Sequence, residues 1–311
     1  MPAPDARIRA ARVIGVDLQT ASVMHRLREA GVATILLKGP ALADLLYDAG
    51  ELRTYTDVDL LVRDMDAERA ASVLTQLGYR PLVDDGALRG HRPVHAHEWS
   101  TPAGASVDLH RTLPGATAAP ADVFAVLAGH TRTLSLCGAE VEALDDEAAL
   151  VQIALHAAHH GPRSPKALSE VERAAARLPD RSWRRAAGIA EALGAAPAFA
   201  AGLRCSPAGT ALADRLHLNR EAPAEVLLKA QGAPPLAAGM DWLLRTPGAG
   251  ARARLIARTA LPMPAALRLW RPLARRGRAG LLLAYLSHPL WLGRHAVPSL
   301  LAMRRARRAA R

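Results

Sequence analysis

Two carboxylates separated by one residue stand out in the stretch Asp-Val-Asp-Leu-Leu-Val at 57–62. The alternation of acidic and aliphatic residues predicts a β-strand on which Asp57 and Asp59 share one face, while Val58 and Leu60 face a core. The two α-carbons would lie roughly 7 Å apart. Neighbouring carboxylates repel each other, and an isolated buried charge is very costly. The pair therefore predicts a facing cation or a rich set of hydrogen-bond donors.

A third acid follows the same pattern. In Val-Asp-Leu-His at 107–110, Asp108 and His110 share one strand face and the aliphatic residues take the other. Magnesium prefers oxygen ligands and is usually held by one or two carboxylates plus substrate phosphates. Two ions about 4 Å apart can clamp both oxygens of an in-line displacement. We predict Asp57, Asp59 and Asp108 as catalytic metal ligands for two Mg²⁺ ions, with Asp108 also able to accept a proton. The alternative is that all three acids face solvent on an open sheet.

Basic and glycine residues surround the first acidic pair. Lys38-Gly39-Pro40 follows a predicted strand at 33–37 and precedes a predicted helix at 41–47. Glycine lets the backbone approach a ligand, and proline suits the first helical position. We expect Lys38 and Gly39 to hold a triphosphate, although Lys38 alone would also suit a plain surface position. Arg53 either reaches phosphate or pairs with an acid.

The remaining pattern places these residues in a mixed α+β region. Apolar spacing predicts one or two helices over 5–30 ending near Gly31, and further elements are predicted as follows. They are a helix at 66–77 capped by Asp66, strands at 79–83, 94–100 and 105–110, a turn at 84–86, a helix at 121–127, and short strands at 132–136 and 140–144.

Strand patterns stop near residue 145. Helices are predicted at 145–160, with Asp145 or Asp146 near the cap, and at 183–193, 195–203, 208–216, 222–230 and 237–244. This change of period predicts a catalytic domain over residues 1–145 and a helical domain over residues 146–311.

Charge is distributed unevenly along the 311 residues. Residues 242–311 contain fifteen arginines and no Lys, Asp or Glu, so the net charge of +11 leaves −4 for residues 1–241. Such a basic end attracts nucleic acid, acidic lipid or an acidic partner, or is simply a solvated helix face. The two cysteines, in no metal spacing, and the absence of an apolar leader predict a cytoplasmic protein.

The apolar stretch at 281–302 is interrupted by Pro289, Arg294, His295 and Pro298. A bilayer-spanning helix needs about 20 predominantly apolar residues, so no transmembrane segment is predicted. Two structures remain open, an arginine-faced helix packed on the body and a peripheral amphipathic anchor. The final Arg-Arg-Ala-Arg-Arg-Ala-Ala-Arg is predicted to be a disordered tail that docks on an acidic partner or on the substrate.

Several histidines have more than one interpretation. His156 and His160 are spaced to share a helix face with His159 nearby, which suits zinc, a nucleotide pocket or ordinary polar packing. No third ligand with recognisable zinc spacing follows. His110 is either hydrogen-bonded within the structure or in contact with substrate. His91, His95 and His97 are predicted to be exposed.

Together these motifs resemble a bacterial family of poorly characterised nucleotidyltransferases in the DNA polymerase beta-like superfamily. The resemblance rests on Lys38-Gly39, Tyr47, Arg53, the acids at 57–59, Gly78-Tyr79, Val107–His110, and the helix with His156 and His160-Gly161, and it covers roughly residues 8–200. Glu170-Val171 approximates an acidic-aliphatic pair of that family. The wider superfamily usually has Gly-Ser where this chain has Gly39-Pro40, so one hydroxyl contact to phosphate is lost.

The resemblance implies a mixed sheet with flanking helices and a metal-dependent transfer of a nucleoside monophosphate from an NTP such as ATP. The acceptor would be a hydroxyl or phosphate on a small molecule, sugar phosphate, peptide or protein, in a biosynthetic or tailoring reaction that releases pyrophosphate. Nucleotide-binding residues would be Lys38, Gly39, Arg53, His110, His156 and His160. The alternatives are a catalytically silent nucleotide- or partner-binding module and a nucleic-acid-binding protein that uses the arginine-rich end.

Overall fold

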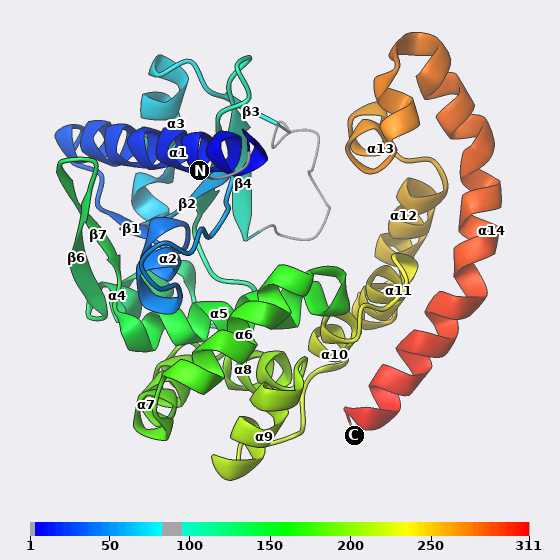
Figure 1. Cartoon of the computed structure of the whole chain (residues 1–311). Helices are drawn as coiled ribbons and strands as arrows, with labels where there is room; N and C mark the ends of the chain where they lie inside the picture. Colours follow the sequence, from blue (N-terminus) through cyan, green and yellow to red (C-terminus); the bar gives the residue numbers. More distant parts are fainter. Residues whose placement is uncertain (1–3, 83–94, 311) are drawn as a thin grey trace.

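The sheet at the centre of the fold is mixed and flanked by helices. The computed structural model describes residues 4–82 and 95–310, and in this part of the chain seven strands form one sheet in the order β3-β4-β5-β2-β1-β7-β6 (Figure 1). The strands are β1 Thr34–Leu36, β2 Asp57–Val62, β3 Arg80–Pro81, β4 Ala96–Ser100, β5 Ser106–His110, β6 Thr131–Leu136 and β7 Ala139–Leu144. The predicted α+β fold class is confirmed.

Strands β2 and β5 lie side by side, parallel and in register. Asp59 is the partner of Asp108, and Leu61 is the partner of His110. Strand β1 pairs with β2 on the other side in antiparallel orientation. Paired residues in register point to the same face of a sheet. The two alternating stretches are therefore neighbours, and their polar residues share a face.

Each face of the sheet has its own hydrophobic core. Val58 and Leu60 pack in one core with side chains of α1, Pro4–Glu29, and α3, Ala67–Gln76. Leu61 points the other way, into a second core with helices α2, Pro40–Leu46, α4, Pro120–Ala128, and α5, Asp146–His160. Because side chains alternate along a strand, Asp57 and Asp59 share the face of Leu61. The acids therefore lie on the side of the sheet that α5 covers.

Local sequence signals explain where the elements near the acids begin. Pro40 opens α2 directly after Gly39, whose φ of 63° is costly for residues other than glycine. Asp145 caps α5 by accepting a hydrogen bond from the Ala148 backbone amide at 2.8 Å. Asp66 precedes α3 but makes no side-chain cap hydrogen bond. The predicted turn at 84–86 lies outside the described residues.

The chain after residue 145 is helical throughout the described part. Its helices are α6 Pro165–Arg177, α7 Asp180–Ala192, α8 Ala196–Leu203, α9 Pro207–Arg215, α10 Ala224–Ala230, α11 Leu236–Arg245, α12 Ala249–Ala260, α13 Pro264–Trp270 and α14 Gly277–Ala309. Short 3-10 helices η1, η3 and η4 span Asp64–Asp66, Gly161–Arg163 and Pro272–Arg275. Helix α6 was not among the predicted helices, although Pro165 at its first position, the Ser164 cap and the spacing of Ala167, Val171 and Ala174 are all helix signals.

The prediction of a disordered C-terminal tail is wrong. Helix α14 continues through the arginine-rich end to Ala309, with Met303 and Ala306 buried. Arg307 Nε lies 3.3 Å from Asp241 Oδ1 of α11, a carboxylate whose side chain is almost completely buried. This ion pair and the two buried side chains hold the end of the chain against α11.

Two further predictions concern the organisation of the chain. One core cluster contains residues from both sides of position 145, such as Leu61 and Leu155, so the division into two domains stays a prediction. No helix in the described part of the chain is both long enough and apolar enough to cross a membrane.

Candidate functional site

Three side chains meet at the centre of the sheet, where β2 and β5 run in parallel. One ligand atom from each of Asp59, Asp108 and His110 lies within 4.8 Å of the others. The register explains the meeting, since Asp59 and Asp108 are direct partners and His110 comes two residues after Asp108. Asp57 shares their face at the start of β2 and is half-buried. The prediction that the third acid lies on a neighbouring strand is confirmed.

Lys38 and His110 converge on one oxygen of Asp59. Lys38 Nζ donates to Asp59 Oδ1 at 2.8 Å, and His110 Nε2 lies 3.0 Å from the same oxygen. Burial alone would raise the pKa of Asp59, but the charges and hydrogen bonds of Lys38 and His110 hold it well below its usual range. Asp59 is therefore a carboxylate at neutral pH. Lys38, predicted to hold a triphosphate or to lie at the surface, pairs with Asp59.

Asp108 has the opposite electrostatic environment. Burial, followed by the charges of Asp59 and Asp57, raises the pKa of Asp108 to about 7. The charge of Asp57 thus contributes to the raised pKa of Asp108. A carboxyl group with this pKa can exchange a proton near neutral pH. The arrangement thus combines a permanently charged carboxylate with one that titrates.

A cluster of imidazoles lies beside the acids. The ring of His95 lies 5.6 Å from that of His110 and 4.8 Å from that of His159, and the rings of His156 and His160 are 4.5 Å apart. Burial, with the charge of Lys38 next, lowers the pKa of His156 and of His160. Both histidines, in the C-terminal part of α5, therefore lie within electrostatic reach of Lys38.

The position of His95 corrects one prediction. Sequence reasoning expected it to be exposed, but it is half-buried, and burial followed by the charge of His110 lowers its pKa to about 3. His97 is also half-buried, and His91 lies outside the described residues. No sequence signal marked His95, because it meets His159 only through the tertiary fold. In the described chain the histidine cluster does not itself form a group of metal-ligand geometry.

Arg53 pairs with an acid, which is one of its two predicted roles. Its Nε donates to Glu170 Oε1 of α6 at 2.9 Å, and its Nη1 donates to the Gly39 carbonyl at 3.1 Å. Both side chains of the ion pair are almost fully buried. Arg53 thus fixes the backbone at Gly39. Lys166, which the sequence did not mark, donates to the Thr54 carbonyl from the start of the same helix.

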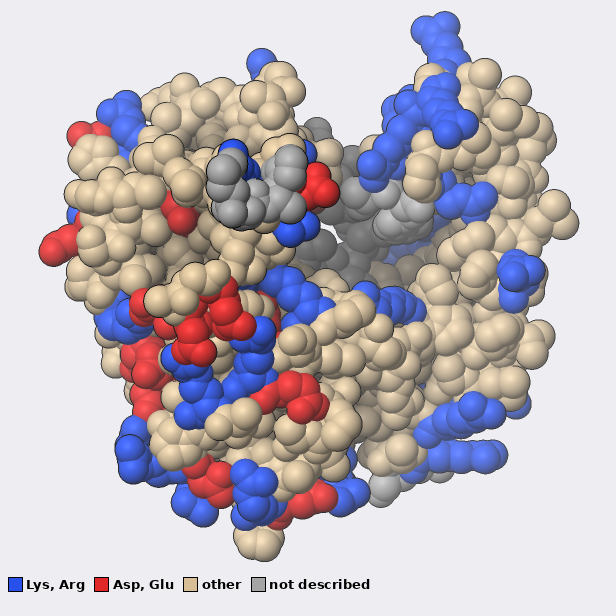
Figure 2. All heavy atoms as spheres, in the orientation of Figure 1, with Lys and Arg blue, Asp and Glu red and all other residues tan. Residues whose placement is uncertain are grey.

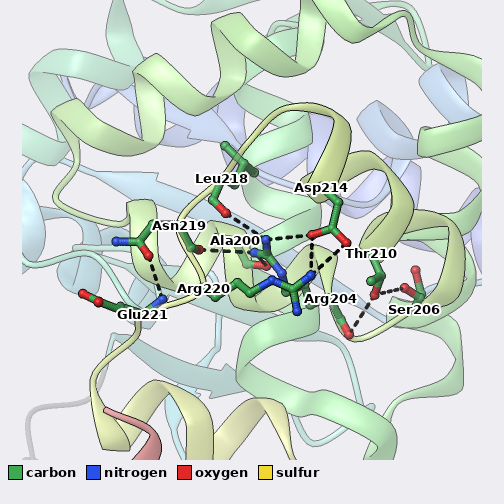
Figure 3. A network of polar contacts seen from close by, with 9 residues as sticks. All are labelled: Ala200, Arg204, Ser206, Thr210, Asp214, Leu218, Asn219, Arg220 and Glu221. Carbon is green, nitrogen blue, oxygen red and sulfur yellow. Dashed lines mark hydrogen bonds and ion pairs between the residues drawn. The ribbon is translucent and has the colours of Figure 1, made fainter. Parts of the chain in front are cut away.

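Cavities border the helices of the described chain after residue 145. One of about 290 Å³ borders the histidine cluster and is lined by residues that include Gly115, His159, Glu225, Lys229 and Arg245. Another, of about 490 Å³, lies between α7, α8 and the segment 216–221. Figure 3 shows how Arg204 fastens that segment, with Nη2 donating to the Leu218 carbonyl at 2.8 Å.

The parallel strands β2 and β5 present carboxylates beside a lysine, and such a site suits a metal ion and phosphate. The comparison with known protein families agrees with this description of the site. The model of a family described as "Uncharacterised nucleotidyltransferase" matches residues 6–208. The chain therefore belongs to this nucleotidyltransferase family, and the predicted enzyme class is confirmed.

Comparison with solved structures gives distant matches. The solution structure of the antibiotic-resistance factor ANT(2'')-Ia is 14% identical, with a TM-score of 0.39, and the match covers 57% of this chain and 91% of that one. An antigenic nucleotidyltransferase-like protein from Paracoccidioides brasiliensis is 14% identical, with a TM-score of 0.34, over 58% of this chain and 92% of that one. None of the curated proteins compared matches the chain.

Proposed function

We propose that the protein moves a nucleoside monophosphate from an NTP to a hydroxyl or phosphate group of an acceptor and releases pyrophosphate. The observation that carries this proposal is the in-register pair of Asp59 and Asp108, with Lys38 2.8 Å from Asp59. Negative charge on the acids and positive charge on the lysine are what a metal-bound triphosphate requires.

The donor set fits a divalent cation. Two carboxylates and one imidazole come together, and His110 Nδ1 is buried without a hydrogen-bond partner. Asp59 and Asp108 would be the principal ligands, with Asp57 and His110 beside them, and Mg²⁺ is the cation that such carboxylates usually hold with phosphate. When bound, the cation would supply charge that stabilises the triphosphate and favours ionisation of the acceptor hydroxyl.

The other side chains position the reactants. Lys38 and the backbone at Gly39 contact phosphate. Arg53 holds Gly39 in place by donating to its carbonyl, and the buried ion pair with Glu170 fixes Arg53 itself. Asp108 would also accept the proton of an acceptor hydroxyl that lies beside the cation. His156 and His160 line the side of the nucleotide that faces α5.

The acceptor binds in the cavity of about 290 Å³ that His159 borders. Its charged lining residues are Glu225, Lys229 and Arg245, and Lys229 Nζ lies 3.4 Å from His159 Nδ1. The ring contact between His159 and His95 joins this cavity to the histidines next to Asp59. An acceptor with polar groups of both signs fits such a lining.

The test measures binding of a non-hydrolysable NTP with and without Mg²⁺. We expect Mg²⁺ to tighten binding, and Asp59→Asn to weaken Mg²⁺-dependent binding at least about tenfold because a metal ligand is lost. The matched control is Glu140→Gln, an exposed acid on β7. An NTP affinity that neither Mg²⁺ nor Asp59→Asn changes would overturn the proposal.

A second candidate is a catalytically silent nucleotide-binding module. It is favoured by the convergence of Lys38 and His110 on Asp59 Oδ1, which satisfies that oxygen internally. This candidate expects NTP binding without pyrophosphate release, whatever acceptor is offered, and unchanged biological activity in Asp59→Asn. Pyrophosphate release that Asp59→Asn abolishes would exclude it.

A further inference from the structure

Helix α14 turns its large aliphatic side chains away from the protein. Its buried positions are held mainly by small or polar residues such as Gly280, Ala284, His288 and Ser299. Its exposed large apolar residues are Leu282, Leu283, Leu286, Leu290, Val297 and Leu301, which we call the outer face. Leu286 is 67% exposed and Leu290 is 78% exposed. A soluble helix normally has the reverse arrangement, with aliphatic residues facing the core.

The outer face forms a single stripe. Steps of four residues lead from Leu282 through Leu286 to Leu290 and again from Val297 to Leu301. Exposed Gly293 and Arg294 occupy this face in the seven-residue interval between Leu290 and Val297. Residues at this spacing lie above one another on a helix. From Leu282 to Leu301 the stripe runs for about 28 Å at 1.5 Å per residue. An exposed apolar stripe of this length marks a surface that another body covers.

Positive charge borders the stripe, and the C-terminal segment that carries it supplies no negative charge. Arg278 lies before it, Arg294 within it, and Arg304, Arg305 and Arg308 after it, all of them exposed. Residues 242–311 contain no Asp or Glu. In Figure 2, the part of the visible surface formed by these C-terminal helices, at the right, is tan and blue without red. The acid nearest in sequence, Asp241, is buried beneath α14 and paired with Arg307 and Arg245.

The apolar stripe and its arginines together discriminate between three partners that could cover it: a second copy of the chain, nucleic acid and a membrane surface. A second copy would bring the same arginines against each other with no carboxylates between them, and like charges repel. Nucleic acid binds arginine through its phosphates, and this interaction would leave the row of leucines exposed to water. The surface of an anionic phospholipid membrane accepts aliphatic side chains at the acyl boundary and arginine at the headgroups.

We propose that the outer face of α14 docks the protein on anionic phospholipid surfaces. The helix lies in the plane of the interface, with its leucines toward the acyl chains and its arginines among the headgroup phosphates. Docking leaves the acids of β2 and β5 accessible, because α14 packs mainly on α10, α11 and η4.

Flotation of the full-length protein with vesicles tests this proposal, and it requires no NTP. We expect binding to phosphatidylcholine vesicles that contain 30% phosphatidylglycerol and little binding to pure phosphatidylcholine. Leu286→Asp with Leu290→Asp should lower the partition coefficient at least about tenfold. Ile14→Asp with Leu18→Asp is the matched control, since both residues are 55% exposed at the same spacing on α1.

A second variant keeps the test decisive if the leucine variant fails to fold. Arg304→Gln, Arg305→Gln and Arg308→Gln should also lower the partition coefficient about tenfold or more, as should raising the salt concentration. Absence of binding to the anionic vesicles overturns the proposal. So does binding that the leucine variant leaves unchanged, binding of duplex DNA or RNA in place of vesicles, or a dimer in solution that the leucine variant dissociates.

Discussion

Arg53 and Glu170 form an ion pair in which the two side chains are only 3% and 2% exposed, and it joins the segment before β2 to helix α6. The same guanidinium donates to the Gly39 carbonyl, next to Lys38. The position of the segment at Lys38 and Gly39, which we propose binds phosphate, therefore depends on a helix more than a hundred residues further along the chain. The helical region supports the site as well as covering it.

Removing one partner of this pair should be strongly destabilising. Glu170→Ala leaves the charge of Arg53 buried without its carboxylate, and breaking a buried pair in this way costs about 3–5 kcal/mol. Denaturant unfolding of the variant measures the loss. Replacing both partners, Arg53→Met with Glu170→Leu, should recover most of the stability while NTP binding stays weak, because Gly39 has lost its donor. Equal stability of Glu170→Ala and the parent chain would contradict this prediction.

The metal-free protein should be stabilised by Asp108→Asn in a pH-dependent way. Burial and the neighbouring acids raise the pKa of Asp108 to about 7, whereas an unfolded aspartate has a pKa of about 3.9. Between these values the folded state binds more protons, so this carboxyl lowers stability as pH rises from about 4 to 7. The gain in Tm should therefore be larger at pH 8 than at pH 5. A gain that is the same at both pH values, or that Glu140→Gln reproduces, would contradict the prediction.

Two helical glycines should respond oppositely to alanine. A Cβ at Gly202 of α8 would lie 1.9 Å from the Ala154 carbonyl oxygen of α5, so Gly202→Ala must separate the two helices. We expect a loss of about 3 kcal/mol or more. Gly188 of α7 is exposed and has no neighbouring atom within 4 Å of its would-be Cβ. Gly188→Ala should gain about 0.5–1 kcal/mol. Thermal unfolding of both variants measures these changes.

The two cysteines should differ in their reaction with a thiol reagent. Cys137 is exposed, whereas burial raises the pKa of Cys205 to about 11. Only the thiolate reacts, so at pH 8 one thiol should react quickly and the other slowly. In Cys137→Ser, the remaining rate should still be rising about tenfold per pH unit at pH 9, and denaturant should make the reaction fast. Two equally fast thiols in the folded protein would refute this expectation.

Much of the region before residue 145 could be predicted because its signals are local. Alternation at 57–62 and 106–110 identified both central strands and the face of each acid, and Asp145 identified the start of α5. Helix α6 was missed although its signals are local too, since Ser164 caps it and Ala167, Val171 and Ala174 recur at helical spacing. The arginine-rich end was taken for a tail, since a sequence does not show that Asp241 lies opposite Arg307.

The sequence by itself determined which residues carry charge and which strand face each acid takes, because these depend on residue type and on the two-residue period of a strand. The tertiary structure alone decided that Asp59 meets Asp108 in register, that Arg53 is buried against Glu170, and that His95 reaches His159. Such contacts join residues far apart in the chain. Their geometry follows from how the sheet pairs and how the helices pack, and no local pattern encodes it.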